Sequence, residues 1–325
     1  MSALGLPMQL PRFDVALRDC VSDDPRTRMA ACVGLAIVDA SQYAEAIAAL
    51  SGLLSDPVYE IRAQVIESLA GLAAVGAAVP KDAILSCATD EAWPVRLTLI
   101  ENLDMFSDAP TEAALTALSD AHPAIRSAAL RLLRRIDAPC EGSRVRSALR
   151  DDDADVRREA ALTLAFLGDS AGQSLLADVL RGGGPMAHEA VLCATRLPEA
   201  TQLAPVLREV LRRWRSGTAL RALAAAALAS ICPGEGDAPI RDMLRGRRAP
   251  VRLAALSALS QLPSRNAIPE LARVASRVDR EAEASAALVA LTEAQRIFPD
   301  AAQPHLDELA QTLQGALRAE LEALR

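Results

Sequence analysis

Residues 151–164 read Asp151-Asp152-Asp153-Ala154-Asp155-Val156-Arg157-Arg158-Glu159-Ala160-Ala161-Leu162-Thr163-Leu164, which is the clearest copy of a unit that recurs along the chain. The unit has an Asp, a short turn and an aliphatic residue followed by Arg. A small residue comes three positions after the Arg, and a Leu comes seven positions after it. The aliphatic residue before the Arg, the small residue and the Leu share one helical face. The stretch therefore predicts a helix that begins after a polar turn and packs through small and aliphatic side chains.

The unit returns every 30 to 34 residues when its copies are aligned on the Arg. The aligned positions are Arg28, Arg62, Arg96, Arg126, Arg157, His188, Arg221, Arg252 and Glu283. Each of these helices, here called B helices, follows a second amphipathic segment, the A helix. The A helices include residues 42–54, 81–88, 111–118, 170–180, 201–213 and 266–275. This period predicts a helical solenoid of about nine hairpins, in which each repeat packs on its neighbours.

These features resemble the HEAT-repeat family, in particular the short HEAT-like repeats also known from phycobilisome bilin lyases. The family pattern, D-x-x-x-x-[VI]-R-x-x-A-x-x-x-L, is matched well at residues 56–62, 90–96, 120–126 and 151–157. The resemblance covers roughly residues 12–300. It implies an all-α fold, a right-handed α-α superhelix whose B helices line the concave surface. It implies little about function, because many activities occur on this scaffold.

The two ends depart from the repeat pattern. Residues 1–11 are interpreted as an N-terminal lead-in, which leaves residues 12–300 as the solenoid. Residues 301–325 are predicted to form one long amphipathic helix with a leucine stripe, made of Leu306, Leu309, Leu313, Leu317, Leu321 and Leu324. The favoured role of this helix is to cap the last hydrophobic face, as solenoids require. A dimerisation helix is the alternative, which Gly315 disfavours because it weakens a long rigid coil.

Composition narrows the function classes. Half of the chain is hydrophobic, at 51%, but only 2% is aromatic, which favours closely packed helices over a β-rich core. The net charge of −7 disfavours a protein that binds nucleic acid over its whole surface. Six widely spaced cysteines, without a CxxC pair, indicate buried thiols in a reducing compartment. With neither a signal peptide nor a membrane-length apolar run, the expected location is cytoplasmic.

The recurring Asp and Arg are predicted to be structural. The Asp would cap the turn, and the Arg would bond to turn carbonyls or to the Asp of a neighbouring repeat, giving a ladder of charge-assisted bonds. The Asp lies six positions before the Arg at Asp56, Asp90, Asp120 and Asp151. In the later repeats this position holds Gly182, Arg215, Gly246 and Arg277.

No catalytic residue, cofactor site or metal site is predicted. The chain has three histidines, and deoxyhypusine hydroxylase, a HEAT-like enzyme, needs several His-Glu pairs for its two irons. Here the single pair His188-Glu189 excludes that activity. A mononuclear site with Cys193 is conceivable, but its coordination shell would be incomplete. There is also no G-x-S-x-G motif and no P-loop. The chain is therefore predicted not to be an enzyme.

The charge distribution gives the candidate site. Residues 1–180 hold 16 Lys and Arg against 26 Asp and Glu, whereas residues 181–325 hold 19 against 16. The difference concentrates in the A–B turns, the turns that connect each A helix to its B helix. Arginines enriched around a Trp are typical of binding hot spots. The candidate partner-binding residues are Arg181, Arg212, Arg213, Trp214, Arg215, Arg245, Arg247 and Arg248.

These observations favour a non-enzymatic scaffold or adaptor. Its protein partner would have an acidic surface and would bind the concave B-helix face and the Arg-rich A–B turn edge of repeats 6 to 8. The alternative from the enzyme class is a bilin-lyase-like subunit that handles a tetrapyrrole and its acceptor protein. Nucleic-acid binding through the Arg-rich edge is a less favoured third hypothesis, and no membrane partner is expected.

Overall fold

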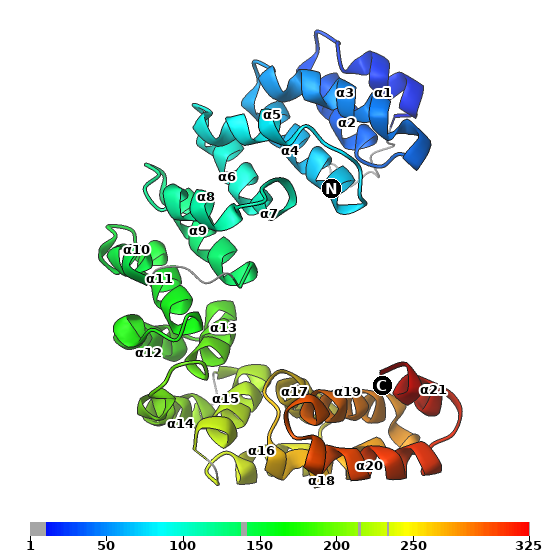
Figure 1. Ribbon diagram of the computed structural model, residues 1–325. Coiled ribbons are helices and arrows are strands. Elements are labelled where there is room, and N and C mark those ends of the chain that lie inside the picture. The colour runs from blue at the N-terminus through cyan, green and yellow to red at the C-terminus, as the bar shows by residue number, and fades with distance from the viewer. Residues whose placement is uncertain (1–10, 138–141, 214–215, 233, 325) are drawn as a thin grey trace. The chain divides into compact units, whose positions relative to one another are not determined.

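Helices account for all the regular structure in the described part of the chain, which confirms the all-α repeat fold (Figure 1). The computed structural model describes residues 11–137, 142–213, 216–232 and 234–324. The chain divides into two compact units, Met1–Ala160 and Ala161–Arg325. The division falls within helix α11, Ala154–Phe166.

The first unit is built from pairs of A and B helices. Its A helices are α1 (Phe13–Asp19), α3 (Tyr43–Gly52), α5 (Lys81–Leu85), α8 (Pro110–Ala117) and α10 (Gly142–Ser147). Its B helices are α2 (Pro25–Leu35), α4 (Tyr59–Ala74), α6 (Trp93–Glu101), α9 (Pro123–Arg135) and the start of α11. A short helix, α7 (Leu103–Phe106), follows α6 after a break at Asn102. Helices α2, α4, α6 and α9 pack successively on one another.

The second unit continues the same alternation. Its A helices are α12 (Gln173–Gly182), α14 (Ala204–Arg212), α16 (Asp237–Arg245) and α18 (Ile268–Ala275). Its B helices are α13 (Pro185–Ala194), α15 (Thr218–Ile231), α17 (Ala249–Gln261) and α19 (Glu281–Ile297). Every aligned position of the repeat thus falls on a B helix, and the described residues contain nine A–B pairs, as predicted.

The core uses the residues that the repeat pattern indicates. The small residue three positions after the Arg is fully buried in several repeats, as are most of the Leu residues seven positions after it. The buried small residues are Ala31, Ala129, Ala160, Ala224 and Ala255. Helix α15 is the extreme case, because residues 222–229 are all buried. Small side chains let neighbouring helices approach closely enough to exclude water from both sides.

Four of the five described cysteines behave as hydrophobic core residues, and Cys232 is partly buried. Cys20, Cys32, Cys87 and Cys193 are buried with free thiols. Burial raises the pKa of the Cys32 thiol to about 12 and also raises that of Cys87. A raised pKa keeps a thiol protonated and poorly nucleophilic at neutral pH. Cys140 lies outside the described residues.

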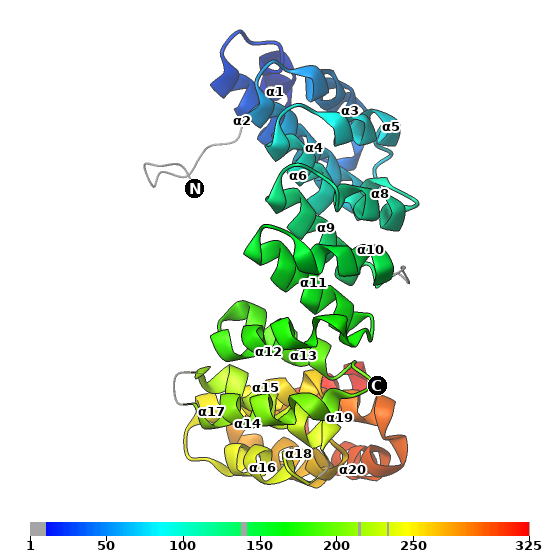
Figure 2. The same ribbon diagram turned by 90° about the vertical axis from the view of Figure 1, so that its left-hand side faces the viewer.

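The C-terminal segment forms two helices, so the prediction of one long helix over residues 301–325 is wrong. Helix α20 (Pro299–Thr312) is followed by Leu313, which is extended, and α21 (Gly315–Leu324) begins at Gly315 with a φ of 62°. This left-handed conformation favours glycine and lets the chain turn back. Both helices pack on α19 (Figure 1), and α20 also packs on α18 (Figure 2).

The leucine stripe of these helices is used inside the chain. Five of its leucines are at most 5% exposed, namely Leu306, Leu309, Leu313, Leu317 and Leu321. They belong to helices that pack on α18 and α19, the last A–B pair. A buried stripe is not available to a second chain as a coiled-coil seam. At the other end, the predicted lead-in lies outside the described residues up to residue 10, and Pro11 packs against Gly34 of α2.

Candidate functional site

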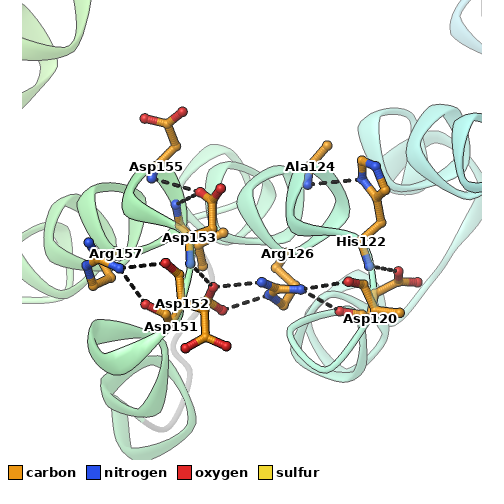
Figure 3. Close-up of polar contacts among 11 residues, drawn as sticks. Asp120, His122, Ala124, Arg126, Asp151, Asp152, Asp153, Asp155 and Arg157 are labelled. Carbon is orange, nitrogen blue, oxygen red and sulfur yellow. Dashed lines mark hydrogen bonds and ion pairs between the residues drawn. The ribbon is translucent and has the colours of Figure 1, made fainter.

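A ladder of ion pairs joins successive A–B turns in the first unit. Arg126 of α9 shows the pattern (Figure 3). Its Nε and Nη2 each donate to a carboxylate oxygen of Asp151 at 2.7 Å, and its Nη1 donates to the carbonyl of Asp120 at 2.9 Å. Equivalent bidentate pairs are Arg28 with Asp56, Arg62 with Asp90 and Arg96 with Asp120. Each Arg thus bonds within its own turn and to the next one.

The Asp of each ladder step also shapes its own turn. Oδ1 of Asp151 accepts a hydrogen bond from the backbone N–H of Asp153 at 2.9 Å (Figure 3). Asp56, Asp90 and Asp120 accept the same bond from the residue two positions later. One carboxylate therefore caps the turn and also fixes the neighbouring repeat. The structural role that the sequence predicts for the recurring Asp and Arg is confirmed.

The ladder predicts a loss of stability in acid. The hydrogen bonds from Arg62, Arg96 and Arg126 hold the pKa of Asp90, Asp120 and Asp151 below the ordinary value of 3.8. A carboxyl whose pKa is lower in the folded state stabilises that state above its unfolded pKa, and this contribution is lost as pH falls through the folded pKa. We expect a melting temperature that is steady above about pH 5 and falls progressively below about pH 4.

Asp90→Asn provides the control for this acid dependence. The variant has no carboxylate at position 90 that acid can protonate, so its melting temperature is expected to fall less steeply with acid than that of the wild type. Calorimetry of both proteins between about pH 7 and pH 3 measures the two slopes. Equal slopes for the two proteins would contradict a role of the ladder carboxylates in this dependence.

The second unit replaces the ladder with other bonds. Arg221 Nε donates to the carbonyl of Leu211 at 2.9 Å, and the ring of His188 lies 3.0 Å from the carbonyl of Gly184 through Nδ1. Arg252 instead pairs with Glu283, which occupies the Arg position of the next repeat. Both side chains of that pair are buried. The hydrogen bond from Arg252 also holds the pKa of Glu283 below its ordinary value.

Three of the candidate arginines have partners inside the second unit. Arg181 lies 3.0 Å from Asp178 and 3.4 Å from Glu209. Arg213 lies 3.5 Å from the same Glu209 and donates to the carbonyl of Arg181 at 2.7 Å. These contacts tie the ends of α12 and α14 together. The positive charges of Arg181 and Arg213 are therefore partly compensated within the second unit.

Arg245 is compensated more fully. Its Nε and Nη2 each donate to a carboxylate oxygen of Glu270 at 3.1 Å. Burial raises the pKa of Glu270, but hydrogen bonds from Arg273 and Arg245 outweigh burial and lower this pKa to about 2. The Arg245 side chain thus connects α16 to α18. Sequence alone places it in a basic turn but does not show this contact.

The remaining described arginines of the candidate site are exposed. Arg212 is the last residue of α14. Arg247 lies in the turn between α16 and α17, and Arg248 is the N-cap residue of α17. None of the three forms an ion pair with another residue in the part of the chain that the structure describes. Trp214 and Arg215 lie outside the described residues. Among the described residues of the site, the arginines without an ion pair thus lie on two adjacent repeats.

The possible metal ligands are not gathered into a cluster. Cys193 is buried in α13, whereas the ring of His188 bonds to the backbone of its own first turn. Across the described residues there is no group of three or more His, Cys, Asp or Glu side chains that could hold a metal ion.

An aromatic row in the acidic turns was not singled out from the sequence. Tyr59 and Trp93 are the first residues of α4 and α6, and they are 41% and 42% exposed. The Trp93 ring stacks on His122, with centroids 3.9 Å apart and planes 4° apart. Trp93 therefore packs against the next turn. The available signal was the shared position of Tyr59 and Trp93, three residues before the ladder Arg.

Family comparison agrees with the ladder and the paired helices. A model of HEAT repeats matches residues 14–104 and 111–191. The chain belongs to the HEAT-repeat family. HEAT repeats form a scaffold for interactions, and this scaffold is the part of the functional prediction that the comparison supports. No curated protein matches the chain significantly.

Solved structures show the same fold at low sequence identity. An Escherichia coli protein, YibA, is 18% identical with a TM-score of 0.55, over 68% of this chain and 81% of that one. The complex of CpcE and CpcF of phycocyanin lyase from Nostoc sp. PCC7120 gives 19% identity and a TM-score of 0.52, over 73% of this HEAT-repeat chain and 96% of that chain. Such similarity shows the fold, and it does not transfer the lyase activity.

Among the described helices, none is long and apolar enough to cross a membrane.

Proposed function

We propose that this HEAT-repeat protein is a non-enzymatic cytoplasmic scaffold that holds a protein partner through the exposed arginines of its second unit. The observation that carries the proposal is the exposure of Arg212, Arg247 and Arg248 on neighbouring repeats, without ion pairs to other described residues. Helices α15 and α17 pack directly on one another, and packed helix axes are usually about 8 to 10 Å apart, so their A–B turns are neighbours. Three guanidinium groups can therefore face one partner.

The partner fitted by this surface has exposed carboxylates. Guanidinium groups form bidentate bonds with carboxylates, and the N-terminus of α17 beside Arg248 adds a partial positive charge. In the sequence, Trp214 and Arg215 follow soon after Arg212. A longer partner would continue along the B-helix face. Charge complementarity of this kind mainly sets partner choice and association rate.

The triple reversal Arg212→Glu, Arg247→Glu and Arg248→Glu tests this proposal. We expect it to weaken partner binding about tenfold or more, because attraction to carboxylates becomes repulsion. Tagged wild type and variant are used to capture partners from the cells that make the protein. A protein lost from the variant is then purified, and its affinity for both forms is measured by calorimetry.

The matched control reverses three exposed arginines of the same unit that lie outside the A–B turns, Arg241, Arg296 and Arg318. It changes the net charge by the same amount, so it should retain the partner that the first variant loses. Equal loss in both triple variants would show a non-specific effect of charge. Full retention by the turn variant would refute the Arg-rich surface.

A further inference from the structure

The first unit has an apolar groove at the turn end of its first two B helices. The groove has a volume of about 280 Å³ and lies between α2 and α4. Its apolar lining is Pro25, Met29, Ala30, Val33, Val58 and Ile61, with Arg26 at its side. Small-molecule sites are usually about 300 to 1,000 Å³. The groove is thus at the lower limit for a whole ligand, and it suits one or two aliphatic side chains of a bound chain.

The aromatic row begins where this groove ends. Val58 lines the groove, and Tyr59 follows it directly as the first residue of α4. Trp93 holds the same position on α6, and His122 at the N-cap of α9 stacks on it. Stacked helices lie about 8 to 10 Å apart. Groove and rings therefore follow one line across four successive repeats.

Exposed carboxylates lie near the groove and the aromatic rings. The ladder Asp residues are occupied by arginines, but other acids in the turns are exposed. Asp23, Asp24, Glu60 and Glu91 lie in or next to the turns before α2, α4 and α6, and Asp152 and Asp155 lie in or next to the turn before α11, one repeat beyond His122. Glu91 and Asp152 form no ion pair with any other described residue. Arg26 supplies a cation beside the groove, yet acids outnumber it along the row. The row combines aromatic faces, which attract cations, with negative charge.

We propose that the groove and the row of Tyr59, Trp93 and His122 bind an extended basic peptide segment of a protein partner. One aliphatic side chain fills the groove between α2 and α4. Arg or Lys side chains lie over the Tyr59 and Trp93 rings and pair with Glu60 and Glu91. An extended chain rises about 3.3 Å per residue, so about nine residues span three helix spacings.

This site is separate from the proposed arginine surface in both place and partner chemistry. It lies wholly within Met1–Ala160, whereas the arginines lie in the second unit. A scaffold with both sites would hold one basic and one acidic partner. Failure of either experiment leaves the other site untouched.

The probe for this site is a fluorescein-labelled peptide of about nine residues with alternating leucine and arginine. Its fluorescence anisotropy is measured with the full chain at low and physiological salt. We expect saturable binding that weakens with salt. The Tyr59→Ala, Trp93→Ala double variant should bind about tenfold more weakly, because it loses two cation–aromatic contacts. Both residues are exposed, so circular dichroism should show unchanged helix content.

Separate variants test the contribution of the exposed acids and that of the apolar groove. Glu60→Gln with Glu91→Gln should weaken binding severalfold, whereas Glu45→Gln with Asp82→Asn, which removes two exposed acids from α3 and α5, should not. Ala30→Leu fills part of the groove. On the wild type, replacing the peptide leucines by alanine should weaken binding, and on Ala30→Leu this replacement should have little effect.

Three results would overturn the proposal. The first is equally tight binding of a peptide that alternates leucine and glutamate. The second is unchanged affinity in the Tyr59→Ala, Trp93→Ala variant. The third is self-association of the wild type in sedimentation experiments that this double variant abolishes, because the occupant would then be a second copy of the chain.

Discussion

Arg62→Ala is expected to lower the free energy of unfolding by about 3 kcal/mol. Arg62 is 8% exposed, and its Nε and Nη2 each donate to a carboxylate oxygen of Asp90 at 2.7 Å. Its Nη1 donates to the carbonyl of Asp56 at 2.8 Å. Truncation leaves a nearly buried carboxylate and a carbonyl without this donor. Removal of one partner of such a pair costs more than the pair contributes, since the remaining charge stays desolvated.

The matched control is Arg158→Ala in the same unit. Arg158 is an exposed arginine that pairs with Asp155 three residues earlier, and surface pairs contribute about 0 to 1 kcal/mol. Urea unfolding of the full chain, followed by circular dichroism, measures both variants. Adding Asp90→Ala to Arg62→Ala should cost less than the two single changes together, because both charges are then gone. A loss no greater than that of Arg158→Ala would show that the ladder is not a stabilising element.

The repeats could be predicted because their determinants are local and recur. Arg126 and Ala129 lie one helical turn apart, and the next copy repeats this spacing 31 residues later at Arg157 and Ala160. The ladder of ion pairs could also be predicted from the sequence, because a fixed period brings each turn against the next one. Only the structure shows that Arg126 bonds to both turns at once.

The C-terminal break was less predictable. The leucines keep their spacing of three and four residues on both sides of residue 314, which predicts an uninterrupted helix. Gly315 in the left-handed conformation, after an extended Leu313, instead turns α21 back onto α19. Burial of Leu317 and Leu321 on the last repeat is a tertiary contact that helix periodicity does not encode.

For the candidate site, the sequence gives the positions of the arginines but not the bonds that they form. The basic turns are real features of the sequence, but counting charges could not show that Arg245 bonds to Glu270 on the next A helix. Partners 25 to 28 residues away depend on how neighbouring helices are placed. Tyr59 and Trp93 are two of the few aromatic residues of the chain, and the sequence alone does not show that they lie on neighbouring turns. Their shared position in the repeat becomes meaningful once the helices are stacked.

Gly236→Ala is the second substitution with a large expected effect. A Cβ at this position would lie 2.2 Å from both the carbonyl oxygen of Ala225 and the backbone nitrogen of Ala229. Both residues belong to α15, which is buried around residues 222–229. The helix therefore cannot shift without disturbing its neighbours. Overpacking that forces backbone movement costs about 3 kcal/mol. We expect the second unit to lose stability by this amount, as measured by urea unfolding of the full chain.

Gly71→Ala gives the opposite expectation from the same chemical change. Gly71 lies inside α4, and an added Cβ would meet no atom within 4 Å. Alanine is about 0.5 to 1 kcal/mol better than glycine within a helix, so this variant should be more stable than the wild type. The pair separates steric exclusion from the general preference for alanine. Equal effects of the two substitutions would mean that α15 and the start of α16 are not in close contact, and that the tight packing of the second unit does not depend on Gly236.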